Sequence, residues 1–166
     1  MTKLKLKENE ITAALPDDAP QIVAMSYDSI RTSGIPITPC FEKLCSVIDN
    51  AVLNEVCFVR RNKVNPKLID GFLLLRHSVP EYSLDSIVYG LMFYIKPAFR
   101  SFSLARKLLN SAKEYGIIVR QPIVLDLFNQ VDAEKKKKLL TYLGFTEVGS
   151  LYVFSPPARI DIGKED

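Results

Sequence analysis

The sequence contains no apolar run that approaches the ~18 residues needed to cross a membrane as a helix. Its first ten residues, MTKLKLKENE, are charged and lack the apolar core of a secretory signal. We therefore expect a cytoplasmic protein that does not engage a membrane. Internal repeats and long Gly/Ser linkers are also missing. This predicts a single domain over residues 1–157 and a flexible C-terminal tail over 158–166.

Cysteine and histidine are scarce. The three cysteines, Cys40, Cys45 and Cys57, are an odd number and form no CxxC pair. A zinc site needs closely spaced ligands of these types, so we expect reduced, mostly buried thiols and no metal. The single histidine, His77, is expected to be a surface or polar-core residue.

Charge of one sign is not in large excess either. The net charge is only +3, which does not imply a nucleic-acid partner and suits an anionic small molecule equally well. What the sequence does have is a composition typical of a globular protein, 48% hydrophobic and 25% charged. Its 166 residues are enough for one domain with a substantial core.

The most informative stretch is Ser86–Gly116. Residues 87–95, IVYGLMFYI, are apolar on both alternating faces, which predicts a strand covered on both sides. Strict alternation would place Ile87, Tyr89, Leu91, Phe93 and Ile95 on one face and Val88 and Met92 on the other. Pro97 has no N–H and ends the ladder. After a polar turn, a helical stripe begins at Leu104, and Gly116 is expected to end that helix. A helix start offers unpaired N–H groups to a phosphate.

The rest of the chain predicts alternating helices and strands. A weak edge strand is expected at Leu4–Leu6, and Pro16-Asp17-Asp18 is a helix-start signal. Thr38 is expected to cap a second helix, and Asp132 a last helix that ends at Gly144. Further strands are expected at Val56–Arg60, Leu68–Arg76 and Pro122–Phe128, and Phe145–Phe154 is expected to be a bent strand or a tight hairpin. The fold class is α/β (α+β), with a mixed, mostly antiparallel sheet of six to seven strands and about four flanking helices.

The stretch from Ile95 to Ala105, IKPAFRSFSLA, resembles motif A of the GCN5-related N-acetyltransferases. That motif is an apolar residue, x-Pro-x-x-Arg, then x-x-Gly-x-Gly/Ala and a helix. Arg100 and Ala105 match it, whereas Ser103 stands where the family usually has glycine. Three other segments also resemble the family, in the same order: Leu15–Pro20, Ile69–Phe72 and Leu143-Gly144-Phe145. The resemblance covers nearly the whole chain and implies the same fold.

The resemblance implies acetyl-CoA as co-substrate. Backbone N–H groups of the turn would hold its pyrophosphate, with Arg100 adding charge. The turn comprises Arg100, Ser101, Phe102, Ser103, Leu104 and Ala105. The pantetheine arm would pair with strand backbone at Phe93, Tyr94 and Ile95, where an N–H would stabilise the oxyanion. Gly90 is expected to mark a distortion of this strand.

An amine acceptor must lose a proton before it attacks, which calls for a base. The candidates are His77, Glu81, Asp85 and Asp126, of which the three carboxylates are our predicted catalytic residues. Many family members protonate the leaving thiolate with a tyrosine four residues before the glycine of Leu-Gly-Phe. Here that position is Leu140, and Tyr142 should face elsewhere.

The function that these residues predict is transfer of acetyl from acetyl-CoA to an unidentified amine by direct attack. The alternative, favoured by Ser103 and Leu140, is a catalytically weakened module that acts through protein contacts. Lys135–Lys138 is expected to be the solvated face of the last helix, so nucleic acid is an unlikely partner. The acceptor and the choice between monomer and homodimer stay open.

Overall fold

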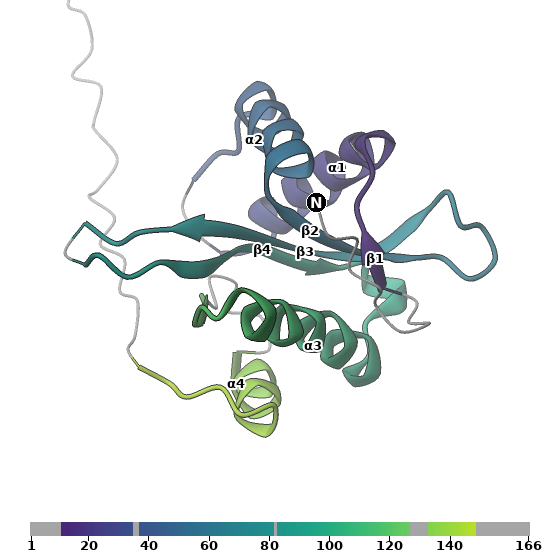
Figure 1. Cartoon of the computed structure of the whole chain (residues 1–166). Helices are drawn as coiled ribbons and strands as arrows, with labels where there is room; N and C mark the ends of the chain where they lie inside the picture. Colours follow the sequence, from purple (N-terminus) through teal and green to yellow (C-terminus); the bar gives the residue numbers. More distant parts are fainter. Residues whose placement is uncertain (1–10, 35–36, 82, 127–132, 149–166) are drawn as a thin grey trace, which may run out of the picture.

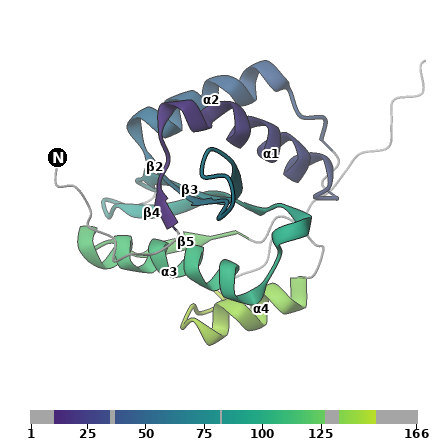
Figure 2. The same ribbon diagram turned by 90° about the vertical axis from the view of Figure 1, so that its right-hand side faces the viewer.

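The computed structural model describes residues 11–34, 37–81, 83–126 and 133–148. A five-stranded sheet, in the order β1-β2-β3-β4-β5, lies between two layers of helices. Helices α1 and α2 cover one face, and α3 and α4 the other (Figures 1 and 2). The strands are β1 (Ile11–Ala13), β2 (Val56–Arg61), β3 (Ile69–Ser78), β4 (Ile87–Ile95) and β5 (Ile123–Leu125). The helices are α1 (Ala19–Arg31), α2 (Phe41–Asn54), α3 (Phe102–Val119) and α4 (Ala133–Tyr142).

The sheet is antiparallel from β1 to β4, and β5 joins β4 in parallel. A parallel neighbour needs a crossover connection, which α3 supplies. None of the described helices is long and apolar enough to span a membrane.

The two helical layers bury separate cores, because neighbouring residues of a strand point to opposite faces. Phe72 and Leu74 of β3 pack under α1 and α2, together with Ile22 and Ile48. Leu73 and Leu75 pack under α3 with Phe58, Val88 and Leu108. All of these side chains are at most 2% exposed. Strand β3 is therefore apolar on both faces. The same holds for β4, as predicted, because Tyr94 packs in the first core and Val88 in the second.

Strand β4 has the predicted bounds but not the predicted alternation. Its pairing with β3 skips from Leu74↔Met92 to Leu75↔Gly90, which leaves Leu91 as a bulge. An extra residue reverses the facing of everything beyond it. Val88 thus packs in the same core as Ile95, while Leu91 packs with Met92 on the other face. The distortion lies beside Gly90, as expected.

Helix α3 is longer at both ends than predicted. It begins at Phe102, because the Ser101 hydroxyl accepts a hydrogen bond from the Leu104 N–H at 3.2 Å. It continues past Gly116 to Val119 and ends with Arg120 in the left-handed region. Gly116 is instead a contact point, since a Cβ there would lie 2.7 Å from Ile123. The prediction that Gly116 ends the helix is wrong.

Of the other predicted helix ends, two are confirmed and one is wrong. The Pro16–Asp18 turn leads into α1, with Asp18 accepting a hydrogen bond from the Leu15 N–H at 2.7 Å. Gly144 follows α4 with a φ of +83°, as a helix-ending glycine should. Cys40, and not Thr38 as predicted, is the N-cap residue of α2, because the first helical hydrogen bond runs from the Leu44 N–H to the Cys40 carbonyl.

The described residues contain five strands where six to seven were predicted. The expected strand at Leu4–Leu6 lies outside them, as do Asp132, residues 149–154 of the last expected strand and the tail over 158–166. Residues 145–148 form no strand. Strand β1, which was not predicted, holds Ile11 against the α3 core.

Candidate active site

The candidate site lies where β4 and β5 part. Strand β5 pairs with β4 over Val88–Gly90, directly before the bulge at Leu91. Strand β4 then runs on to Ile95, and no strand in the described part of the chain continues β5 along this edge. The backbone of Met92–Ile95 therefore borders an open wedge that is closed at one end by the bulge.

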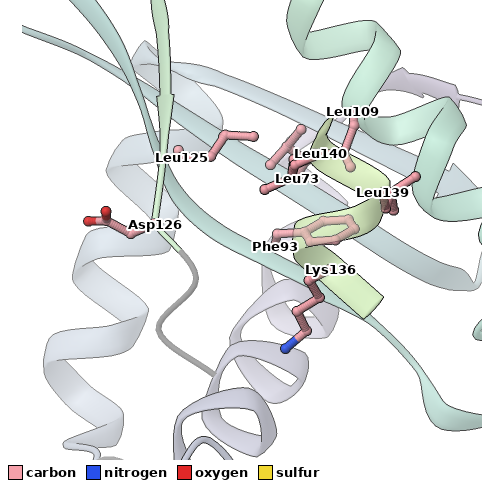
Figure 3. Close-up of a pocket in the computed structure, with 9 residues that line it drawn as sticks. Leu73, Phe93, Leu109, Leu125, Asp126, Lys136, Leu139 and Leu140 are labelled. Carbon is pink, nitrogen blue, oxygen red and sulfur yellow. The ribbon is translucent and has the colours of Figure 1, made fainter. Parts of the chain in front are cut away.

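A small cavity, partly open to solvent, occupies the narrow end of this wedge (Figure 3). Its wall is apolar, and Asp126 and Lys136 lie at its rim. The lining residues are Leu73, Gly90, Phe93, Leu109, Leu125, Asp126, Lys136, Leu139 and Leu140. Gly90 belongs here for a steric reason, because a Cβ would lie 2.3 Å from the end of the Leu125 side chain.

The turn predicted to bind phosphate sits at the start of α3. A second hollow opens beside it. Two hydroxyls and three cationic side chains contribute to its wall, which consists of Arg60, Lys63, Phe99, Ser101, Ser103, Leu104 and Lys107. Arg60 forms an ion pair with the buried Asp70, so the anion-attracting charge comes from the two lysines and the N-terminal end of an 18-residue helix.

The amides of this turn are not equally available. The Leu104 N–H donates to the Ser101 hydroxyl, and the Ala105 N–H to the Ser101 carbonyl at 3.1 Å. The Leu104 side chain is buried in the α3 core, whereas Phe102 and Ser103 are exposed. This concentrates the helix-start donors on Phe102 and Ser103.

Arg100 is turned back onto β4. Its Nε donates to the Ile95 carbonyl at 3.1 Å, and its guanidinium carbon lies 5.7 Å from the centre of the Tyr94 ring. The side chain thus ties the turn to the end of the strand.

Of the predicted bases, the structure places only Asp126 at the cavity. Asp126 follows β5 at the narrow end of the wedge and accepts a hydrogen bond from the Tyr89 hydroxyl of β4. Glu81 and Asp85 are exposed in the β3–β4 connection, beyond the last pair of that hairpin, Ser78↔Ile87. That tip projects from the end of the sheet opposite to the α3 turn (Figure 1).

His77 is hydrogen-bonded at the surface of the protein, as expected for a histidine with a structural role. Its ring nitrogens lie 2.8 Å from the Gln121 side-chain oxygen and 2.6 Å from the Tyr115 hydroxyl. Both partners belong to the C-terminal end of α3 or the residues after it. The cluster joins β3 to α3 and does not reach the cavity.

The residue in place of the family's tyrosine faces the cavity. Leu140 is part of its apolar wall. Tyr142 is 67% exposed and packs edge-on against Phe102, with 5.7 Å between ring centres. Tyr142 thus faces elsewhere, as predicted.

Sequence reasoning missed a carboxylate–phenol pair on the α1 face of β4. The Tyr94 hydroxyl donates to Asp28, near the end of α1. Burial raises the pKa of Tyr94, and its hydrogen bond to Asp28 raises that pKa further. Asp28 comes three residues after the buried Met25, at the edge of the apolar stripe of α1, which was the available signal.

Comparison with solved structures identifies the fold. An aminoglycoside N-acetyltransferase in complex with CoA superimposes with a TM-score of 0.66, at 12% identity, over 89% of this chain and 94% of that one. A ribosomal-protein-alanine N-acetyltransferase from Brucella melitensis biovar Abortus 2308 gives 0.62 at 14% identity, over 87% and 96%. No family model and no curated protein matches the sequence. The chain has the fold of the GCN5-related N-acetyltransferases, as the sequence predicted.

Proposed function

We propose that the protein is an N-acetyltransferase that transfers acetyl from acetyl-CoA directly to an amine. The observation that carries this proposal is the wedge between β4 and β5. It joins an anion-attracting helix start to a narrow apolar cavity with a carboxylate at its rim. The solved aminoglycoside N-acetyltransferase of this fold was crystallised with CoA, which supports the choice of donor.

The turn before α3 binds the diphosphate in this proposal. The amides of Phe102 and Ser103 are the donors, and the charges of the adjoining hollow add a long-range attraction. Arg100 positions the turn through Ile95 and Tyr94. Ser103 replaces the usual glycine at an exposed position, where its small side chain leaves the backbone approachable.

The pantetheine arm lies along the open edge of β4 and uses the backbone of Phe93, Tyr94 and Ile95 as a neighbouring strand would. This places the thioester at the bulge, where a strand N–H stabilises the oxyanion that forms. The apolar wall, which includes Leu140, excludes water from the reacting carbonyl.

The amine nitrogen attacks the thioester carbon, and the carbon–sulfur bond then breaks to give the amide and CoA thiolate. Asp126, held by Tyr89, takes the proton that the amine releases, either directly or through one water. A thiol is acidic enough for its thiolate to leave without a dedicated acid, and water protonates it afterwards. Leucine at position 140 is compatible with this route.

Calorimetric titration with acetyl-CoA tests the proposal, with Ser103→Glu as the variant. Glutamate at the first turn suits the helix dipole, so folding is preserved, but its charge repels a diphosphate. We expect wild-type binding and at least a ~10-fold weaker affinity in the variant, or about 1.4 kcal/mol. Ser46→Glu, on the exposed side of α2, carries the same charge and should bind like the wild type. Absence of binding by the wild type would overturn the proposal.

A further inference from the structure

Two carboxylate–phenol pairs flank the bulge of β4. Tyr89 holds Asp126 on one side of Leu91, and Tyr94 holds Asp28 on the other. Tyr94 is in the core under α1 and α2. Tyr89 points to the same face, because it alternates with Val88, which packs under α3. The wedge thus has one anionic group at each end of its α1 side.

We propose that Asp28 binds a second cationic group of the acceptor, so that the acceptor is a di- or polyamine. The reacting amine lies at Asp126, and a distal ammonium lies at Asp28. This inference rests on the proposed function for the identity of the reaction, but the binding of a dication by Asp28 can be measured without turnover.

The charge of Asp28 is only partly used by the fold. One oxygen accepts from Tyr94, while the side chain is still 41% exposed. The other oxygen lies 3.5 Å from an Arg31 nitrogen, and the Arg31 side chain is 68% exposed. An exposed pair of this kind contributes little, about 0–1 kcal/mol, so a ligand ammonium can compete with it.

Tyr94 fixes the direction of the carboxylate. The phenol is 5% exposed, and the Arg100 guanidinium covers its ring. A buried phenol that stays protonated is a constant hydrogen-bond donor, so it holds one carboxylate oxygen and leaves the other facing out. A pair whose only role is to clamp α1 to β4 would work equally well with a neutral acceptor such as asparagine.

Spacing selects a long acceptor. Tyr89 and Tyr94 pair with Arg76 and Phe72, which are four residues apart on β3, so about 13 Å separates them at ~3.3 Å per residue. A monoamine cannot reach both carboxylates. An extended aliphatic chain with an amino group at each end can do so. Its methylene groups would contact the exposed parts of Leu91 and Met92, which lie between the two pairs and are half-buried against the core under α1 and α2.

The test compares diamines with matched amino alcohols, from putrescine to decamethylenediamine, in which a hydroxyl replaces the distal amino group. The variants are Asp28→Asn, which keeps an acceptor for Tyr94, and Asp49→Asn, a control at an exposed position of α2. For the wild type we expect a lower KM for one chain length of diamine than for its amino alcohol. Asp28→Asn should raise that KM about ten-fold, with kcat and the amino-alcohol constants unchanged. Asp49→Asn should behave as the wild type.

Calorimetric titration of the same diamine into CoA-saturated protein gives a readout without turnover. Binding that weakens about ten-fold in Asp28→Asn supports the inference even if no amine is acetylated, a result that would refute the proposed function alone. A diamine preference that survives Asp28→Asn, or an equal loss for both substrate types, overturns the inference and leaves the acetyltransferase proposal standing. No diamine binding to the wild type also overturns it.

Discussion

At the scale of single residues, the three cysteines differ in reactivity for a reason that lies in their surroundings. Cys40 is exposed, Cys45 half-buried and Cys57 buried in the core under α1 and α2. Burial raises the pKa of the Cys57 thiol to about 12, and the negative charge of Asp18 acts in the same direction. The thiolate is the nucleophile, so we expect the buried Cys57 to react far more slowly than the exposed Cys40.

We therefore expect iodoacetamide at pH 9 to alkylate Cys40 and spare Cys57, as measured by mass spectrometry of the digested protein. The same shift makes stability depend on pH. The pKa of Cys57 in the folded state exceeds the ordinary thiol value of 9.0, so its contribution to stability is complete below pH 9 and is lost as the pH rises toward about 12. Cys57→Ala should lack this part of the slope in urea titrations. Equal labelling of Cys57 and Cys40 in native protein would show that the thiol is not protected.

The same scale explains which site residues the sequence could indicate. Asp126 could be found, because it is a carboxylate at the end of an apolar strand. Asp28 could not be paired with Tyr94, since 66 positions separate them and only the packing of α1 on β4 brings them together. Arg100 matched a motif for phosphate binding, yet its side chain also contacts Ile95 and Tyr94, a second role that the motif does not contain.

At the scale of elements, α3 and β5 are fitted to each other at one glycine. A Cβ on Gly116 would lie 2.7 and 2.8 Å from Ile123 side-chain atoms and 3.0 Å from the Gln121 carbonyl oxygen. Alanine in a helix interior ordinarily gains about 1 kcal/mol over glycine. Overpacking costs about 1–3 kcal/mol, and a backbone carbonyl cannot move aside as a side chain can.

Gly116→Ala should therefore destabilise the protein by about 1–2 kcal/mol in spite of its better helix propensity, as measured by chemical denaturation. Ile123→Ala in the same chain should recover part of that loss, because it removes two of the three close contacts. A Gly116→Ala variant as stable as the wild type would mean that β5 can shift away from α3.

This contact also shows what element-level patterns can and cannot predict. The bounds of β4 were predictable, because an apolar run followed by Pro97 has one interpretation. The end of α3 was not, because glycine serves both as a helix stop and as a point of close approach, and only the position of Ile123 distinguishes the two. The bulge at Leu91 was indicated by Gly90, but its reversal of the strand's facing follows from the pairing register with β3.

At the scale of the whole molecule, the order of elements was sufficient to predict the fold. Helices that connect strands must pack on one face of the sheet or the other. The four segments that resemble the acetyltransferases also occur in the same order as in that family. The strand count was less secure, since a three-residue strand such as β1 contains too few residues to show alternation.

The wedge between β4 and β5 makes a prediction for the whole chain. If acetyl-CoA takes the place of a strand beside Met92–Ile95, its binding should protect the outward amides of that segment from hydrogen exchange. The amides of Phe102 and Ser103 should be protected with them, because the diphosphate and the pantetheine belong to one ligand. Strand β2 lies two strands away from the wedge and serves as the internal control.

Hydrogen–deuterium exchange with and without acetyl-CoA, resolved by peptide, measures this pattern. We expect slower exchange over residues 91–104 and an unchanged rate over Val56–Arg61. Ser103→Glu should reduce the difference at ligand concentrations that just saturate the wild type. Binding accompanied by protection elsewhere, with residues 91–95 unchanged, would contradict the placement of the pantetheine along β4. In that case the open edge of β4 would need a different occupant, because its backbone groups would still lack a strand partner among the described residues.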